Sequence, residues 1–224
     1  MKALLLSVHP LIWILFFTSS LAFVYFAPYD IYFSALFYSE EKGFYLRYEW
    51  WVQLFYHSVK FFIIGVLLFY IALIVDSYRK KKKSLHVYLK QLLFLVLVLA
   101  IGPGLIVNWV FKENFGRARP QNIIEFGSTK TFSPAYIPTN ACETNCSFSC
   151  GHASGAFFAI ALALLARQRR TLALSTAIGY GFLVGLGRII QGGHFFSDVV
   201  VSFFIVFIVS KMLYYLMFEK IRDN

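Results

Sequence analysis

The stretch Gly-Arg-Ile-Ile-Gln-Gly-Gly-His-Phe-Phe-Ser-Asp, residues 187–198, is a short polar segment between two apolar runs, residues 171–187 and 195–218. Runs of this kind are typical of helices that cross a membrane. The whole chain follows the same pattern, because 59% of its 224 residues are hydrophobic and only 14% are charged. A soluble domain is about half apolar and about a quarter charged. The composition therefore predicts an all-α, polytopic membrane protein with a single domain over residues 1–224.

The polar segment itself carries three residues that suit catalysis. Arg188 precedes His194 by six positions, and Asp198 follows His194 by four. If the chain is helical from residue 195 onward, His194 and Asp198 lie one turn apart and close enough to hydrogen-bond. A carboxylate that holds one imidazole nitrogen leaves the other free as a base or nucleophile. Gly192 and Gly193 permit a sharp turn and the close approach of a ligand. A structural hydrogen-bond network is the alternative interpretation.

Six apolar runs predict a bundle of six transmembrane helices, at about residues 4–27, 52–75, 88–111, 151–166, 171–187 and 195–218. The first run is interpreted as a retained helix, because it is longer than a signal peptide and lacks a small-residue cleavage site. Gly102-Pro103-Gly104 predicts a kink in the third. The fourth, at about 15 residues and about 22 Å, is shorter than a hydrocarbon core of about 30 Å.

Two further features suit the membrane interface. Residues 28–50 form an aromatic connector of mixed charge, which is typical of the headgroup region. His57 and Lys60 interrupt the second run, and we interpret them as interfacial or snorkelling side chains.

Basic residues set the predicted orientation. They gather in segments on one side of a six-helix bundle (Lys2, Arg79–Lys83, Lys90, Arg167, Arg169, Arg170, Lys220 and Arg222). An excess of Lys and Arg marks the cytoplasmic side, so both termini are expected in the cytoplasm and the loop 112–151 outside. Because topology accounts for the formal charge of +10, nucleic-acid binding is not expected.

This topology brings six ionisable residues from four segments to the outer face (Lys112, Arg119, His152, Arg188, His194 and Asp198). The three cations lack a facing acidic cluster and so specify an anion, and the fork of arginine matches phosphate oxygens. Gly151, at a predicted helix start, adds the positive end of the helix dipole. With a histidine nucleophile and a histidine acid, the set indicates phosphoryl transfer. Because no Asp/Glu/His cluster has metal-ligand spacing, we predict a metal-independent site without a cofactor.

Three motifs carry a resemblance to a known family: Lys112 and Arg119-Pro120 separated by six residues, then Gly151-His152, then Arg188-x5-His194-x3-Asp198. Over residues 112–198 the chain resembles the membrane branch of the type 2 phosphatidic acid phosphatase (PAP2) superfamily. The stretches Asn145-Cys-Ser-Phe-Ser-Cys-Gly-His-Ala-Ser and Gln191-Gly-Gly-His-Phe-Phe-Ser-Asp-Val-Val are similar to those of bacterial lipid A phosphatases, particularly the 4′-phosphatase type.

The resemblance implies a role for each signature residue. His194 attacks phosphorus to form a phosphohistidine, and Asp198 orients and charge-stabilises His194. His152 protonates the leaving group and later activates water. The phosphoryl oxygens are held by Lys112, Arg119 and Arg188, with Gly151 and Cys150 beside them.

The chain departs from the family pattern at two of these positions. Cys150 stands where the family usually has a serine whose hydroxyl contacts phosphate, and a thiol is a poorer donor. Gly187 replaces the serine that usually precedes the arginine of the third motif.

Four other residues of the outer loop remain open to two interpretations. Arg117 is an extra cation that either reaches a second anionic group of the substrate or is a solvated charge. Cys142, Cys146 and Cys150 are spaced by four, which is a weak zinc signal without a fourth ligand. In an oxidising periplasm we predict a Cys142–Cys146 disulfide, with free thiols as the alternative.

Two classes of function fit these observations. A transporter or anion-binding protein is expected to carry polar groups near the middle of its spans, and here the mid-span positions are almost all apolar. The sequence therefore favours an enzyme of the inner membrane whose site faces the periplasm and whose partner is a membrane lipid. Its expected substrate is lipid A, the 4′-phosphate in preference to the 1-phosphate, with undecaprenyl diphosphate or phosphatidylglycerol phosphate as alternatives. No obligate protein partner is inferred.

Overall fold

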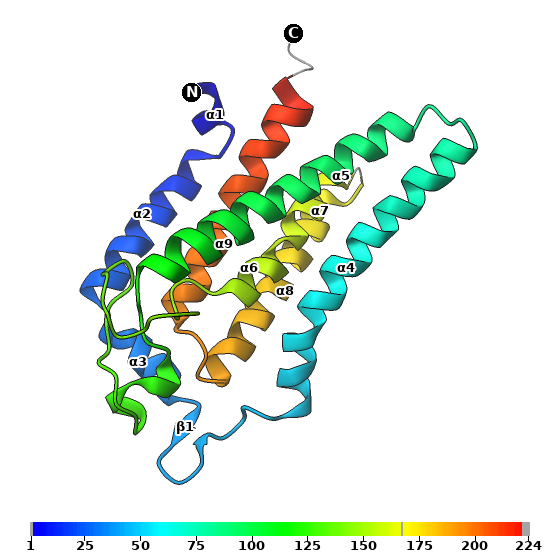
Figure 1. The fold of residues 1–224 in the computed structure, drawn as a ribbon. Coiled ribbons are helices and arrows are strands. Elements are labelled where there is room, and N and C mark those ends of the chain that lie inside the picture. The colour runs from blue at the N-terminus through cyan, green and yellow to red at the C-terminus, as the bar shows by residue number, and fades with distance from the viewer. Residues whose placement is uncertain (1, 167, 221–224) are drawn as a thin grey trace.

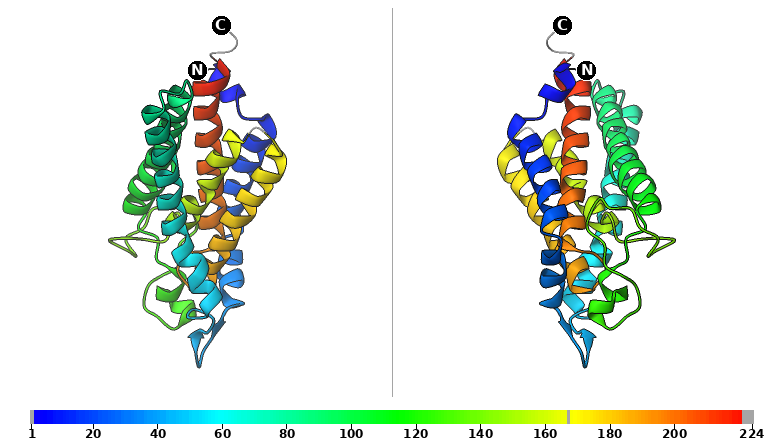
Figure 2. Two further views of the ribbon diagram at one scale, coloured as in Figure 1. Left: turned by 90° about the vertical axis from the view of Figure 1, so that its right-hand side faces the viewer. Right: turned by 90° about the vertical axis from the view of Figure 1, so that its left-hand side faces the viewer.

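The computed structural model describes residues 2–166 and 168–220, so that Arg167 and Arg222 of the orientation argument lie outside the described residues. The chain is an elongated helical bundle (Figure 1). Helix α1 (Lys2–Leu6) and the C-terminal π-helix η4 (Tyr215–Glu219) lie at one end of it. A small antiparallel hairpin, β1 (Tyr38–Ser39) and β2 (Gly43–Phe44), lies at the opposite end in both side views of Figure 2.

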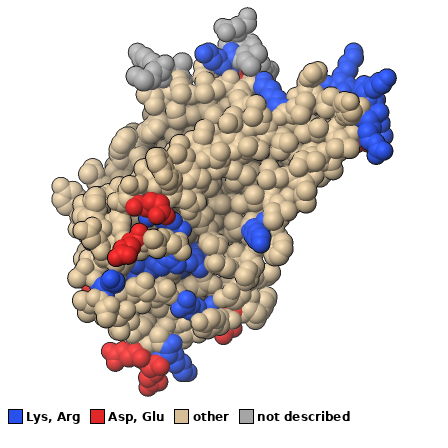
Figure 3. All heavy atoms as spheres, viewed as in Figure 1, with Lys and Arg blue, Asp and Glu red and all other residues tan. Residues whose placement is uncertain are grey.

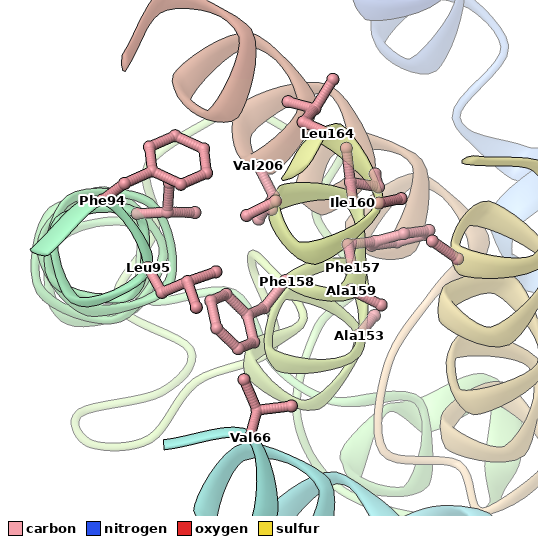
Figure 4. Close-up of a cluster of buried hydrophobic side chains, with 14 of the residues drawn as sticks. Val66, Phe94, Leu95, Ala153, Phe157, Phe158, Ala159, Ile160, Leu164 and Val206 are labelled. Carbon is pink, nitrogen blue, oxygen red and sulfur yellow. The ribbon is translucent and has the colours of Figure 1, made fainter. Parts of the chain in front are cut away.

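The centre of the bundle is the broken helix α6 (Gly151–Phe157) and α7 (Ala159–Leu165), which covers the predicted fourth run. It packs among α4 (Trp50–Arg79), α5 (Leu85–Leu99), α8 (Arg170–Ile190) and α9 (Phe196–Tyr214). Figure 4 shows side chains of the core that they form. Because residues 153–161 are all buried by protein, this helix need not match the thickness of a bilayer.

The predicted set of six membrane spans is not confirmed. Within the described residues, four helices are long and apolar enough to cross a membrane: Trp50–Arg79, Leu85–Lys112, Arg170–Ile190 and Phe196–Glu219. A fifth span is reached if α2 (Pro10–Tyr25) and α3 (Pro28–Ala35), which are bent by 85° from each other, count as one. The segment Gly151–Leu165 is apolar but shorter than these, and a bilayer core needs about 20 residues.

The N-terminal run is not the single helix predicted for residues 4–27. The chain breaks between α1 and α2 because Pro10 fixes the first turn of α2, where the Nδ1 atom of His9 accepts a hydrogen bond from the backbone N–H of Leu11. Beyond α2, the predicted connector 28–50 contains helix α3 and the hairpin. The sharp turn before α3 directs Asp30 into the protein, where its side chain is buried.

The third predicted run continues α5 as the π-helix η1 (Ala100–Lys112), so that Leu85–Lys112 forms one long helix. Pro103 lies inside η1, and the side-chain amide of Asn108 donates to the Pro103 carbonyl over 2.8 Å. The Gly-Pro-Gly sequence thus coincides with a change of hydrogen-bond register within a continuous helix.

Glycines let α8 approach its neighbours closely. A Cβ atom on Gly181 would lie 2.0 Å from the ring of Phe157 in α6, and one on Gly185 would lie 2.3 Å from Val199 in α9. Small residues are the usual means of bringing helices together in a membrane, where lipid is as apolar as the side chains. The loop between α8 and α9, which carries His194, is therefore held against the N-terminus of α6.

Charged side chains on the visible face gather in a few separate groups (Figure 3). Lys and Arg crowd the turn between α4 and α5, and a second basic group lies among the loops of the opposite half, where acidic residues accompany it (Figure 3). Between these groups the visible surface is mainly uncharged. It includes exposed side chains of α4 such as Leu54, Phe61 and Leu68, as expected of a surface that faces lipid.

Candidate active site

His194 lies in the loop between α8 and α9, and its side chain is 1% exposed. The loop depends on the two glycines before it. Gly192 has a φ of +65°, and a Cβ there would lie 2.5 Å from the ring of Phe44. A Cβ on Gly193 would lie 2.4 Å from the guanidinium of Arg188. The predicted sharp turn is confirmed, and the close approach is made by the protein's own side chains.

The hydrogen bonds of His194 define which ring nitrogen is free. Its Nδ1 atom lies 2.7 Å from the carbonyl oxygen of Ser147. Because a carbonyl can only accept, Nδ1 carries the proton, and in the neutral imidazole Nε2 keeps its lone pair. Burial, together with the positive charges of Arg188 and Lys112, lowers the pKa of His194 to about 3 against the opposing attraction of Asp198. The imidazole is therefore neutral and nucleophilic at Nε2 at physiological pH.

The predicted hydrogen bond between His194 and Asp198 is wrong in this structure, where the Nδ1 atom and the Oδ2 atom are 3.6 Å apart. Asp198 is in the first turn of α9, and its Oδ2 atom turns back to accept from the backbone N–H of Phe195 at 2.8 Å. The same oxygen accepts from the Ser147 hydroxyl at 2.5 Å. Asp198 thus acts on His194 as a nearby charge, while the Ser147 carbonyl fixes the ring.

The predicted cations surround two adjoining hollows. A cavity of about 230 Å³ is lined by Arg119 and Arg188, together with Arg47, Tyr48, Gln53, Tyr56, Gln121, Gln191 and Gly193. A cleft of about 420 Å³ contains Lys112, Gly151 and His152, together with Tyr56, His57, Val59, Lys60, Ile63, Pro103, Asn108 and Gly155. Neither lining includes a carboxylate, so the described residues around both hollows favour an anion.

Tyr56 of α4 lies between the two hollows and organises their side chains. The ring of His152 stacks on it with a centroid distance of 4.2 Å and an interplanar angle of 21°. The guanidinium of Arg188 lies over the same ring, 4.9 Å from its centroid, and also donates to Oε1 of Gln191. One aromatic side chain therefore contacts both His152, the predicted acid, and Arg188, a predicted phosphate ligand.

Arg119 is held by the loop that the disulfide closes. Its Nε and Nη2 atoms donate to the carbonyl oxygen of Asn145 at 3.1 and 2.7 Å. Asn145 lies inside the Cys142–Cys146 disulfide, which is present as predicted. The loop therefore orients Arg119, the predicted phosphate ligand, through Asn145, and the adjacent Ser147 orients His194, the predicted nucleophile.

Cys150 does not line either hollow. Its side chain is buried, and its sulfur accepts a hydrogen bond from the backbone N–H of Ala153 at 3.4 Å as the N-cap of α6. Burial raises the pKa of the Cys150 thiol to about 11, so that the thiol stays protonated. Because the sulfur is engaged in capping α6, the contact of Cys150 with phosphate stays a prediction.

Arg117 is neither solvated nor free to reach a substrate, so both interpretations of this residue are wrong. Its side chain is 1% exposed. One guanidinium nitrogen donates to Asp198 at 2.5 Å and another to Asp30 at 2.8 Å, while Nε donates to the carbonyl of Ser133 at 2.8 Å. The two carboxylates raise the pKa of Arg117 above its ordinary value in spite of the opposing effect of burial.

Several residues of the site were not identified from the sequence. Ser147, Asn145 and Tyr56 act through a backbone carbonyl or an aromatic face, for which the sequence holds no specific signal. Asp30 is a lone carboxylate in the aromatic stretch Pro28-Tyr-Asp-Ile-Tyr-Phe, and this isolation is a signal that could have identified it. Arg47 is a cation within the aromatic connector 28–50.

Comparisons with known proteins agree with the geometry. The PAP2 superfamily model matches residues 91–222. A lipid A 4′-phosphatase of Francisella tularensis subsp. novicida (strain U112) is 36% identical over 208 residues, which cover 88% of this chain and 90% of the relative. Lipid A 4′-phosphatases of Rhizobium leguminosarum (32% over 131 residues; 58% of this chain and 56% of the relative) and Rhizobium etli (35% over 102 residues; 45% and 40%) are also similar. No solved structure matches the chain.

Proposed function

The chain belongs to the PAP2 superfamily, and from this premise we propose that it is a membrane phosphatase that removes the 4′-phosphate of lipid A. The observation that carries the proposal is a buried His194 whose Nε2 lone pair is free and whose pKa is lowered by burial and by the charges of Arg188 and Lys112. These two cations line hollows whose described lining has no carboxylate. The 36% identity to a lipid A 4′-phosphatase over 88% of the chain supports the choice of substrate.

The reaction proceeds in two displacements at phosphorus. In the first, Nε2 of His194 forms a bond to phosphorus while the bond to the sugar oxygen breaks and a protonated His152 gives its proton to that oxygen. Burial and the neighbouring cations lower the pKa of His152 to about 4, and the negative charge of the bound phosphate opposes this shift, so that His152 takes up its proton when substrate binds. In the second, His152 takes a proton from water, the water oxygen bonds to phosphorus, and the bond to His194 breaks to release inorganic phosphate. Lys112, Arg119 and Arg188 hold the non-bridging oxygens throughout and stabilise their charge.

The imidazolium that forms at His194 is matched by groups already in place. Its Nδ1–H stays bonded to the Ser147 carbonyl, and the Asp198 carboxylate lies 3.6 Å away. Because these groups are buried and fixed before the reaction, little reorganisation accompanies the appearance of the positive charge.

The rim of the 230 Å³ cavity supports a sugar headgroup. Arg47, Tyr48, Gln53 and Gln121 line this cavity together with the predicted phosphate ligands Arg119 and Arg188, and its described lining has no carboxylate. Oε1 of Gln121 is buried and accepts no hydrogen bond from the described part of the chain. A sugar hydroxyl would satisfy this oxygen, and Arg47 would contact a further anionic or hydroxyl group. A glycerol phosphate offers fewer such groups.

We further propose that the protein lies in the inner membrane with this site facing the periplasm. The basic turn between α4 and α5 lies at one end of the bundle and the site at the other (Figure 3), and basic loops are retained on the cytoplasmic side. Cysteine replacements Lys81→Cys and Thr129→Cys in a cysteine-free variant test the orientation, because both positions are exposed. An impermeant thiol reagent applied to intact cells should label Thr129→Cys alone, and labelling of Lys81→Cys would reverse the orientation.

The substrate is tested by mass spectrometry of lipid A from cells with and without the protein. We expect loss of one phosphate, from the 4′ position, and no loss with His194→Ala. An unchanged phosphate count, with activity of the purified protein on undecaprenyl diphosphate or phosphatidylglycerol phosphate, would refute lipid A as the substrate. Loss of the 1-phosphate instead would refute the regiochemistry alone.

A further inference from the structure

Arg117 is buried between two carboxylates that come from distant parts of the chain. Asp30 lies in α3 and Asp198 in α9, and both are almost wholly buried. The guanidinium also contacts the rings of Phe195 and Phe132, at 4.2 and 5.5 Å from their centroids, and these two rings pack edge to face against each other. No path is left from Arg117 to the cavity, so its role is exerted through its partners.

Asp30 is bound at the start of α9 as well as to Arg117. One carboxylate oxygen accepts from the backbone N–H of Ser197 at 2.9 Å, and the other accepts from the Ser197 hydroxyl at 2.5 Å and from Arg117 at 2.8 Å. The guanidinium also donates to the Ser197 hydroxyl at 2.9 Å. A continuous chain of hydrogen bonds therefore runs from α3 through Arg117 to Asp198.

The charges of this chain do not cancel. One guanidinium faces two carboxylates, so the group formed by Arg117, Asp30 and Asp198 carries a net charge of about −1 when all three are ionised. Asp198 is the carboxylate that lies beside His194. If Arg117 faced Asp198 alone, the pair would be neutral and would attract a positive imidazole much less strongly.

We propose that Asp30 is a positioning residue for the phosphatase reaction: by sharing Arg117 with Asp198, it leaves Asp198 with the negative charge that the phosphohistidine step requires. The inference rests on the proposed function, because it assigns a role in the formation of an imidazolium at His194. Asp30 touches neither substrate nor His194 and acts only through Arg117 and the first turn of α9. The bend between α2 and α3, which positions Asp30, thereby contributes to the proposed reaction.

The test begins with Asp30→Asn, which keeps the shape of the side chain and removes its charge. We expect kcat to fall about tenfold to hundredfold, as is typical when a group that orients a catalytic ligand is lost, with KM nearly unchanged because the phosphate ligands stay in place. Rapid-quench measurement should show the loss in formation of the phosphohistidine. Asp30→Glu should restore part of the rate, and Asp76→Asn, at an exposed carboxylate of the α4–α5 end, should match the wild type.

A double variant separates charge from packing. Adding Arg117→Gln to Asp30→Asn removes one charge of each sign, so Asp198 again carries the negative charge of the site, and kcat should rise above that of Asp30→Asn alone. If Asp30 had only a structural role, removal of its buried partner Arg117 as well would lower the stability and the kcat of the protein further. A double variant no faster than Asp30→Asn, or an Asp30→Asn variant with wild-type kcat, would overturn the proposal. Circular dichroism and gel filtration verify that each variant is folded.

The same assays distinguish failure of the inference from failure of the proposed function. Each variant is measured on lipid A and on a soluble aryl phosphate, whose hydrolysis needs the phosphate pocket but no lipid headgroup. Hydrolysis of the aryl phosphate alone would refute lipid A as the substrate and still test Asp30. A different result would reject only the role of Asp30. In that case the wild type is active on lipid A, His194→Ala is inactive, and Asp30→Asn is as active as the wild type.

Discussion

Reduction of the Cys142–Cys146 disulfide should weaken the enzyme without touching a catalytic side chain. The loop that the disulfide closes supplies the carbonyl of Asn145 to Arg119, at 3.1 and 2.7 Å. The adjacent Ser147 supplies its carbonyl to His194 at 2.7 Å. When the bond opens, these carbonyls become free to move, and the phosphate-binding arginine loses its fixed position.

The size of the effect follows from the length of the closed loop. The two cysteines are separated by four positions, and closing a loop of about five residues restricts the chain by about 2 kcal/mol. If substrate binding must supply this ordering in the reduced protein, kcat/KM falls by up to about 30-fold, since each 1.4 kcal/mol or so is a factor of ten. Most of the loss should appear in KM, because Arg119 binds the phosphoryl group in the ground state as well as in the transition state.

The assay is phosphate release by the purified protein in detergent before and after treatment with a phosphine reductant. A Cys142→Ser/Cys146→Ser variant is the matched control, and it should be slow and indifferent to the reductant. Cys150 is buried and not part of the disulfide, so it should not contribute to the response. Mass spectrometry confirms that the bond has opened. An opened disulfide with unchanged kcat/KM would refute the idea that the loop orients Arg119 and His194.

Four further outcomes follow from the site and the packing. Replacement of His194 or His152 by Ala should lower turnover by several orders of magnitude in a phosphate-release assay, and only His194→Ala should abolish the phosphohistidine detected by mass spectrometry. Addition of EDTA should leave turnover unchanged, since no metal-ligating cluster was predicted. Arg47→Ala should reduce kcat/KM for lipid A by about tenfold or more, as for loss of one hydrogen bond to a charged group, and should leave hydrolysis of phosphatidic acid nearly unchanged. Gly181→Ala should lower the thermal unfolding temperature, because the added methyl group would lie 2.0 Å from the Phe157 ring.

The positions of the long helices could be predicted because apolar runs are a local property of the sequence. The runs at residues 52–75 and 195–218 correspond to Trp50–Arg79 and Phe196–Glu219. The number of spans could not be predicted in the same way. The apolar content of the run at 151–166 is the same whether lipid or protein surrounds it, and here protein buries it. A break such as that at Pro10 depends on a local cap rather than on hydropathy.

The chemistry of the site was recognisable from residue types, but the partners of those residues were not. Lys112, Arg119, Arg188 and His152 line the two hollows, whereas His194 is buried and is not among the lining residues. The spacing of His194 and Asp198 predicted a direct hydrogen bond, and the helix start redirected the carboxylate to a backbone N–H instead. Capping groups compete for the same oxygen, and a spacing rule cannot tell which donor is nearer.

Arg117 shows most clearly what local pattern leaves undetermined. Its position between Lys112 and Arg119 suggests one more cation for an anionic substrate. In the structure, however, its guanidinium is paired with the carboxylates of Asp30 and Asp198, which lie 87 and 81 residues away in the chain. A buried arginine must be paired, and a buried carboxylate must be paired as well. Asp30, the lone acid of the stretch Pro28-Tyr-Asp-Ile-Tyr-Phe, therefore implied a buried cation somewhere in the outer half of the bundle. Pairing these two residues removes Arg117 from the phosphate ligands and leaves Asp198 negative beside the nucleophile.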